Sequence, residues 1–456
     1  MNGDESQAVN DVLDRVPTID RFLRVDELEA STDALAQQHP DLVRVETVGR
    51  STDGQTIRML RIGGGKTQLL FFACPHPNEP IGAMALETLA KLLVDDERLR
   101  GTEYTWNLIK CMDPDGTRLN EGWFSGPFTV TNYATHFFRP GASAQAEWTF
   151  PVSYKTYTFL NPNDETKALM TAITGLRPRF IYSLHNAGMG GGYFYLTPHR
   201  PDVDDALRSL VTRHGIPLAL GEPEMPWGVE LSPAIYRTPT LREHYDFIAA
   251  HSQEDPGTKL KAGEGSYGFA REICDPAHLM VEVPYFFDPR TGDTSEADGT
   301  RREAILAGLD RAEPMVDLIR DTMQQVRDRL TEPTRLRDAC LEFAEMLPQS
   351  LAVQRSWATD APGLDTLATV AQSFDSTIAY RFYRVLFVGM VRRTLKTQLG
   401  VADDRVVREA LSRVEEGFDR WTAELEAELD YRAIPIGDLV RIQLGAALHY
   451  LRALDL

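Results

Sequence analysis

Short apolar runs alternate with amphipathic segments between residues 42 and 287. Runs rich in Val, Ile, Leu and Phe predict β-strands, and apolar residues at helical spacing predict helices between them. This alternation is typical of an α/β fold in which helices flank a mixed, mostly parallel sheet. The predicted strands cover residues 42–48, 57–62, 68–74, 105–112, 180–185, 192–196, 217–221 and 279–284, and the predicted helices cover residues 25–38, 81–93, 165–174 and 204–213.

The pattern changes after residue 300. From there on, Ala, Leu, Arg and Glu recur at helical spacing without strand signals, which predicts an all-α domain. We therefore divide the chain into an N-terminal segment (1–24), an α/β domain (25–300) and a helical domain (301–456). The helices predicted in the last part cover residues 302–330, 335–346, 364–399, 405–429 and 436–453, with breaks near Pro333, Pro348, Pro362, Gly400 and Pro435.

Composition narrows the possible partners. The 456 residues carry 48 Lys and Arg against 67 Asp and Glu, a formal net charge of -19, so no basic surface for nucleic acid is expected. The four cysteines form no CxxC pair, and the first thirty residues contain no apolar signal core. The most apolar long stretch, residues 380–391, contains arginines and is too short to span a bilayer. We expect a cytoplasmic protein without a membrane segment.

Two histidines and a carboxylate occupy positions where strands end. His76 and Glu79 follow the predicted strand 68–74 in an HxxE pattern, and His185 ends the strand 180–185 just before a glycine-rich loop. Two imidazoles and one carboxylate leave a coordination position open for water, as in a catalytic zinc site. Each feature alone also has an ordinary explanation, a helix cap or surface pair for HxxE and a packing residue for His185.

Glu282 is a lone carboxylate in an otherwise apolar predicted strand. Burying it there would be costly unless it faced a functional site, where it could act as a general base. The alternative is an outward-facing residue of an edge strand. Glu222 and Glu224, further back in the chain, are expected in a surface loop.

The order of these residues resembles the zinc carboxypeptidases of the carboxypeptidase A and B type. The resemblance extends to residues 41–65, which look like the family's entry segment, to residues 114–116 (Pro-Asp-Gly) and to residues 265–269 (Gly-Ser-Tyr-Gly-Phe). It covers roughly residues 25–290 and assigns the α/β domain the role of the catalytic domain. The family's Asn-Arg pair and its mobile tyrosine have no counterpart at the expected positions.

The resemblance implies one Zn²⁺ per chain and hydrolysis of an amide bond next to a free carboxylate, by a zinc-bound water that Glu282 activates. It implies a peptide or an acylated amino acid as the substrate. The implied metal ligands are His76, Glu79 and His185. The other residues it assigns to the site are Arg118 as a catalytic residue and Arg139, His136 and Tyr267 as substrate-binding residues.

Two other hypotheses about the function stay open. N-acyl-amino-acid deacylases of the aspartoacylase or succinylglutamate desuccinylase type look similar around HxxE and the later histidine. A binding or scaffold protein could also keep the fold without catalysis, although the retention of all candidate ligands and of Glu282 argues against it. The helical domain could mediate a homo-oligomer or act as a lid.

Overall fold

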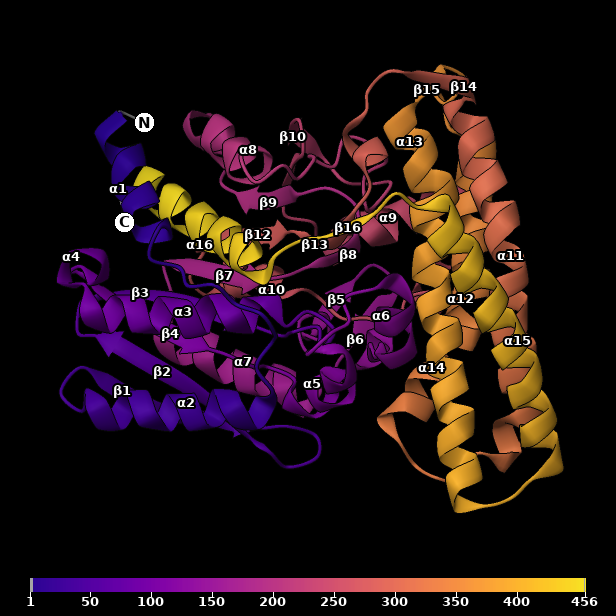
Figure 1. The fold of residues 1–456 in the computed structure, drawn as a ribbon, viewed down its shortest axis with the longest axis horizontal. Coiled ribbons are helices and arrows are strands. Elements are labelled where there is room, and N and C mark those ends of the chain that lie inside the picture. Colours follow the sequence, from indigo (N-terminus) through magenta and orange to yellow (C-terminus); the bar gives the residue numbers. More distant parts are fainter. Residues whose placement is uncertain (1–2, 455) are drawn as a thin grey trace.

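A nine-stranded mixed sheet forms the centre of the α/β part (Figure 1). The computed structural model describes residues 3–454 and 456. The strand order is β1-β2-β4-β3-β7-β12-β9-β11-β10, in which β4, β3, β7 and β12 run parallel and most outer pairs are antiparallel. This confirms the predicted fold class. The strands are β1 (Val43–Arg50), β2 (Thr56–Gly63), β3 (Thr67–Ala73), β4 (Tyr104–Ile109), β7 (Phe180–Leu184), β9 (Tyr193–Thr197), β10 (Glu230–Ser232), β11 (Ile235–Arg237) and β12 (Ala277–Glu282).

Helices cover both faces of this sheet because its central strands are apolar on both sides. Along β3, Leu69 and Phe71 pack in the cluster that contains α3, while Leu70 and Phe72 pack against α7 on the other face. This alternation follows from the two-residue period of a strand. The helices of the α/β part are α1 (Gly3–Leu13), α2 (Val25–Gln38), α3 (Ile81–Asp95), α4 (Glu97–Arg100), α5 (Pro114–Asn120), α6 (Val130–His136), α7 (Asp164–Leu176), α8 (Asp204–Thr212), α9 (Leu241–His251) and α10 (Ser266–Ile273).

Long helices stand beside the sheet as a bundle, which we call the helical region (Figure 1). Its helix α14 packs against α6 of the α/β part. The helical region consists of α11 (Arg301–Val326), α12 (Arg335–Asp360), α13 (Val370–Phe374), a π-helical turn (Asp375–Ala379), α14 (Tyr380–Val401) and α15 (Arg405–Glu428). The remaining short strands are β5 (Val152–Tyr154), β6 (Tyr157–Phe159), β8 (Ala187–Met189), β13 (Pro284–Phe287), β14 (Glu296–Thr300), β15 (Leu367–Thr369) and β16 (Arg432–Ala433).

The last helix, α16 (Ile436–Ala453), leaves the bundle and returns to the sheet. It packs against α1, α3 and α8, and Figure 1 shows it beside α1. Gln443 on α16 donates hydrogen bonds to the backbone carbonyls of His185 (2.7 Å) and Val281 (3.2 Å). The C-terminal helix therefore supports the strand ends around His185. The division into an α/β domain and a helical domain at residue 301 stays a prediction.

Three predicted elements differ from the structure. The helix predicted from residue 364 begins only at Val370, after the short strand β15 (Leu367–Thr369). The break expected at Pro348 does not occur, because buried apolar side chains such as Phe343 and Leu351 hold α12 together on both sides of the proline. Residues 217–221 form no strand, only a bridge between Leu218 and Gly192, and the chain then enters a loop. Among the helices of residues 3–454, none combines the length and the apolar character needed to cross a bilayer.

The two glycines of α14 offer a matched test of how this helix packs on α6. A Cβ at Gly389 would lie 2.2 Å from the carbonyl oxygen of Ala134, whereas a Cβ at Gly400 would meet nothing within 4 Å. Gly389→Ala is therefore expected to lower the free energy of unfolding by about 1–3 kcal/mol through overpacking. Gly400→Ala is expected to raise it by up to about 1 kcal/mol through helix propensity. Urea unfolding measures both, and equal effects in the two variants would contradict the close approach.

Candidate metal centre

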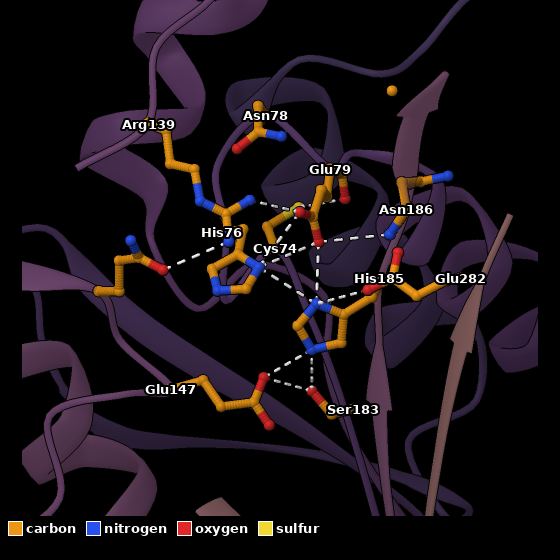
Figure 2. A network of polar contacts seen from close by, with 12 residues as sticks. Cys74, His76, Asn78, Glu79, Arg139, Glu147, Ser183, His185, Asn186 and Glu282 are labelled. Carbon is orange, nitrogen blue, oxygen red and sulfur yellow. Dashed lines mark hydrogen bonds and ion pairs between the residues drawn. The ribbon is translucent and has the colours of Figure 1, made fainter. Parts of the chain in front are cut away.

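His76, Glu79 and His185 meet at one edge of the sheet (Figure 2). The first two lie in the loop between β3 and α3, and His185 directly follows β7. Because β3 and β7 are parallel neighbours, their carboxyl ends reach the same edge. His185 Nδ1 lies 2.9 Å from Glu79 Oε2 and 3.1 Å from His76 Nδ1, and His76 Nδ1 lies 3.1 Å from Glu79 Oε1. All three side chains are buried.

This donor set fits a divalent metal ion. One ligand atom from each residue can be chosen so that all three lie within 4.8 Å of one another. Two imidazoles and a carboxylate are ligands that suit zinc. Burial and the charge of Arg139 lower the pKa of His76 to about 4, so its ring is neutral at pH 7, as metal ligation requires.

Glu147 fixes the orientation of His185, a role that no pattern in the sequence indicated. The Nε2 atom of His185 lies 2.6 Å from Glu147 Oε2, and the other oxygen of Glu147 accepts a hydrogen bond from Ser266 (2.6 Å). Burial alone would raise the pKa of Glu147, but His185, Ser183 and Ser266 lower it to about 2. A carboxylate at Nε2 leaves Nδ1 directed at Glu79, which is the arrangement that supports metal-binding histidines.

His76 is held by a different partner. The indole N–H of Trp148 donates to His76 Nε2 over 2.9 Å. The ring proton of His76 therefore sits on Nδ1, facing the oxygens of Glu79. Metal ligation through Nδ1 would move this proton to Nε2, where the N–H of Trp148 could no longer donate.

Glu282 ends β12, the strand between β7 and β9. Glu282 therefore does not lie on an edge strand, which was the alternative considered from the sequence. Its Oε1 atom lies 3.8 Å from His185 Nδ1, and its Oε2 atom is buried without a hydrogen-bond partner among the described residues. Burial, followed by the charge of Glu79, raises the pKa of this carboxyl group well above its ordinary value.

These groups open into a cavity of about 630 Å³. The sheet with its loops, α6 and α9 form part of the lining, and α11, α12, α14 and the π-helical turn of the helical region form the rest. The prediction of a surface loop for Glu222 and Glu224 missed this role, because both side chains line the cavity. Glu224 accepts hydrogen bonds from the hydroxyl groups of Tyr193 (3.1 Å) and Tyr195 (3.0 Å), and Glu222 pairs with Arg301.

The structure brings only one of the other predicted site residues to the cavity. Arg139 lines it and donates to Glu79 Oε1 over 2.8 Å. Arg118 does not line it and instead pairs with Asp26 on α2. His136 and Tyr267 do not line it either, since the His136 ring contacts its own helix and Tyr267 packs on the ring of His278.

A second group of acidic residues, Asp113, Asp115 and Glu165, also lies close enough together to hold a metal ion. Both oxygens of Asp113 accept from Arg335 of α12, at 2.6 and 2.8 Å. Asp115 accepts from Ser51 and Gln55, and Glu165 accepts from Thr52. The side chains in this cluster are therefore already paired, and they attach the helical region to the α/β part.

The free energy of unfolding should depend on pH through Asp375, which lies in the π-helical turn. Burial raises its pKa from 3.8 to about 8, so the folded protein keeps a proton that the unfolded chain releases. The stability that protonated Asp375 contributes to the fold is fully present below pH 3.8. This stability is lost progressively as the pH rises to about 8. Asp375→Asn stays neutral and can still accept from the backbone N–H of Glu222. The variant should therefore gain stability relative to wild type between pH 4 and pH 8 in thermal melts, and a constant difference would contradict the shifted pKa.

The segment that contains the three candidate metal ligands is similar to a known protein family. Residues 28–215 match the family model of the zinc carboxypeptidases. Among solved structures, the carboxypeptidase A of Helicoverpa armigera is 16% identical, with a TM-score of 0.38 over 62% of this chain and 70% of that one. A metallo-carboxypeptidase from Burkholderia cenocepacia is 14% identical, with a TM-score of 0.33 over 74% and 70%. The matched residues 28–215 contain His76, Glu79 and His185, so this segment of the chain is similar to the zinc carboxypeptidase family.

Proposed function

We propose that the protein is a zinc-dependent hydrolase that cleaves an amide bond next to a free carboxylate. The match of residues 28–215 to the family model of the zinc carboxypeptidases supports metallopeptidase activity. The proposal rests on one observation: His76, Glu79 and His185 meet beside an oxygen of Glu282 that has no hydrogen-bond partner among the described residues. A buried carboxylate with a raised pKa in a cavity is the form a general base takes.

His76, Glu79 and His185 are the residues that would hold the metal ion. A bound Zn²⁺ polarises a carbonyl group and lowers the pKa of water. Glu282 then takes a proton from the attacking water through Oε2 while the water oxygen bonds to the amide carbon. When the C–N bond breaks, Glu282 gives this proton to the leaving nitrogen, so that one carboxylate and one amine are formed.

Arg139 is the guanidinium group that touches a candidate ligand, Glu79. We assign to it the stabilisation of the negative charge that develops on the carbonyl oxygen, because fixed N–H donors act strongly at such a place. Trp148 donates to His76 Nε2 and lines the same cavity, so its indole ring lies beside the candidate metal ligand.

A substrate panel tests this proposal. Zinc-loaded protein would be incubated with N-blocked dipeptides and with N-acyl amino acids, each as the free acid and as the C-terminal carboxamide. We expect hydrolysis of free acids and little or none of the matching carboxamides. The better substrate class decides between a carboxypeptidase and an N-acyl-amino-acid deacylase. Hydrolysis of acids and carboxamides at equal rates would contradict the requirement for a carboxylate.

A further inference from the structure

The helical region supplies one wall of the cavity, and much of the polar part of that wall lies on one segment. Ile305 and Leu309 of α11 and Trp357 of α12 contribute mainly apolar surface. The π-helical turn and the start of α14 add hydroxyl groups and a guanidinium group. The polar residues of this segment that line the cavity are Asp375, Ser376, Tyr380, Tyr383 and Arg384.

Arg384 is a partly buried cation that has no counter-ion among the described residues. Among the described residues, two arginines and no lysine line the cavity, and Arg139 is already bound to Glu79 and Gln145. Arg384 makes no hydrogen bond or ion pair within residues 3–454. Its guanidinium group lies over the ring of Tyr380, 4.0 Å from the ring centre. Stacking of this kind fixes the position of the group and leaves its N–H donors free for an anion.

The carboxylates of the cavity do not supply that anion. Glu79 is engaged by Arg139, Glu222 by Arg301, and Glu224 by two tyrosine hydroxyl groups. Glu282 also lines the cavity, but among the described residues its one ion-pair contact is with His185, at 3.8 Å, and not with Arg384. Asp375 accepts from the backbone N–H of Glu222, and its pKa of about 8 keeps it largely protonated at pH 7. In a chain with a net charge of -19, an unpaired guanidinium facing a cavity indicates that the anion comes from a ligand.

Two further donors lie on the same segment. The hydroxyl groups of Ser376 and Tyr380 are buried and have no hydrogen-bond partner among the described residues. Buried polar groups are almost always paired in folded proteins, so an unpaired one beside a cavity marks a ligand contact. Ser376, Tyr380 and Arg384 follow one another at intervals of four residues, which places neighbouring side chains on the same side of a helix.

We propose that Ser376, Tyr380 and Arg384 form a carboxylate-binding subsite, through which the helical region holds the free carboxylate of the substrate. The guanidinium fork bonds both carboxylate oxygens, and the two hydroxyl groups donate to the same anion. This inference rests on the proposed function and gives the helical region a direct part in substrate recognition. It also supplies the carboxylate anchor for which the α/β part lacks the expected Asn-Arg pair.

Binding measurements on the zinc-loaded full chain test the subsite without depending on turnover. The probes are 4-phenylbutanoate and 4-phenylbutanamide, which differ only in the carboxylate and contain no amide bond next to a free carboxylate that the protein could cleave. Wild type should bind the acid more tightly, and Arg384→Met should weaken binding of the acid by about 10- to 100-fold while leaving the amide unchanged. Arg384→Lys should restore part of the affinity, because it keeps the charge but not the fork. Tyr380→Phe and Ser376→Ala should each cost the acid about 2- to 10-fold.

Arg392→Met is the matched control. Arg392 lies on the same helix, pairs with Glu415 and does not line the cavity, so its replacement should leave both affinities unchanged. Equal binding of acid and amide by wild type, or an acid affinity that Arg384→Met does not change, overturns the subsite. Hydrolysis with an unchanged KM in Arg384→Met would keep the proposed function and reject the subsite. If carboxylate binding depends on Arg384 but the protein hydrolyses no substrate of the panel, the subsite is supported and the proposed function is rejected.

Discussion

Glu282→Gln is expected to lower kcat by about 10²- to 10⁴-fold, the range in which general acid–base catalysis contributes. Glutamine has nearly the same size and can keep the position at the end of β12. It cannot accept a proton from water or return one to the leaving nitrogen. Since Oε2 of Glu282 has no partner among the described residues, the substitution breaks no hydrogen bond of that atom. The loss should therefore be catalytic, with the fold unchanged.

Single-turnover and steady-state hydrolysis of the best substrate from the panel measure this effect. The metal content and the melting temperature of Glu282→Gln serve as controls and should match wild type. A fall in kcat with unchanged zinc content supports the role of base. A variant that keeps more than a tenth of the wild-type kcat would assign the proton transfer to another group.

The second large effect is expected from His185→Ala. This substitution removes one of three candidate ligands, and a site left with His76 and Glu79 alone should hold little zinc. Zinc content should fall from about one ion per chain to below about one tenth, and hydrolysis should be lost with it. Elemental analysis after dialysis measures the content. Full zinc occupancy in His185→Ala would show that the metal binds elsewhere.

Glu147→Gln provides a graded comparison at the same histidine. The amide can replace one hydrogen bond but cannot balance the charge of His185, so zinc affinity should fall by about 10- to 100-fold without being lost. Competition with a chelator measures this change. An affinity equal to that of wild type would mean that Glu147 does not act through His185, despite their 2.6 Å contact.

The sequence predicted the candidate ligands because each one ends or follows an apolar strand. His76 and Glu79 follow β3, His185 follows β7, and parallel strands bring such positions to one edge. The strand order could not be predicted, since nothing in the pattern of β12 shows that it lies next to β7. The pairing of β12 with β7 brings Glu282 to within 3.8 Å of His185.

Other parts of the site depend on tertiary packing alone. Glu147 lies in an irregular loop before β5 and has no periodic signal that would distinguish it from a surface residue. Ser376 and Arg384 belong to a segment whose spacing predicts only a helix, and its contact with the cavity follows from the packing of α14 on the α/β part. Arg118 was assigned a catalytic role from its position in the sequence, but its side chain pairs with Asp26 on α2.

X-ray absorption spectroscopy at the zinc edge of the loaded wild-type protein tests the central claim most directly. We expect a shell of nitrogen and oxygen neighbours at about 2.0–2.2 Å, with the outer-shell pattern of two imidazole rings and without sulfur. Such a spectrum matches His76, Glu79 and His185 with one position left for water. A sulfur neighbour at about 2.3 Å, which would implicate Cys74 or Cys111 instead, or a shell without imidazole, would contradict the site described for this protein.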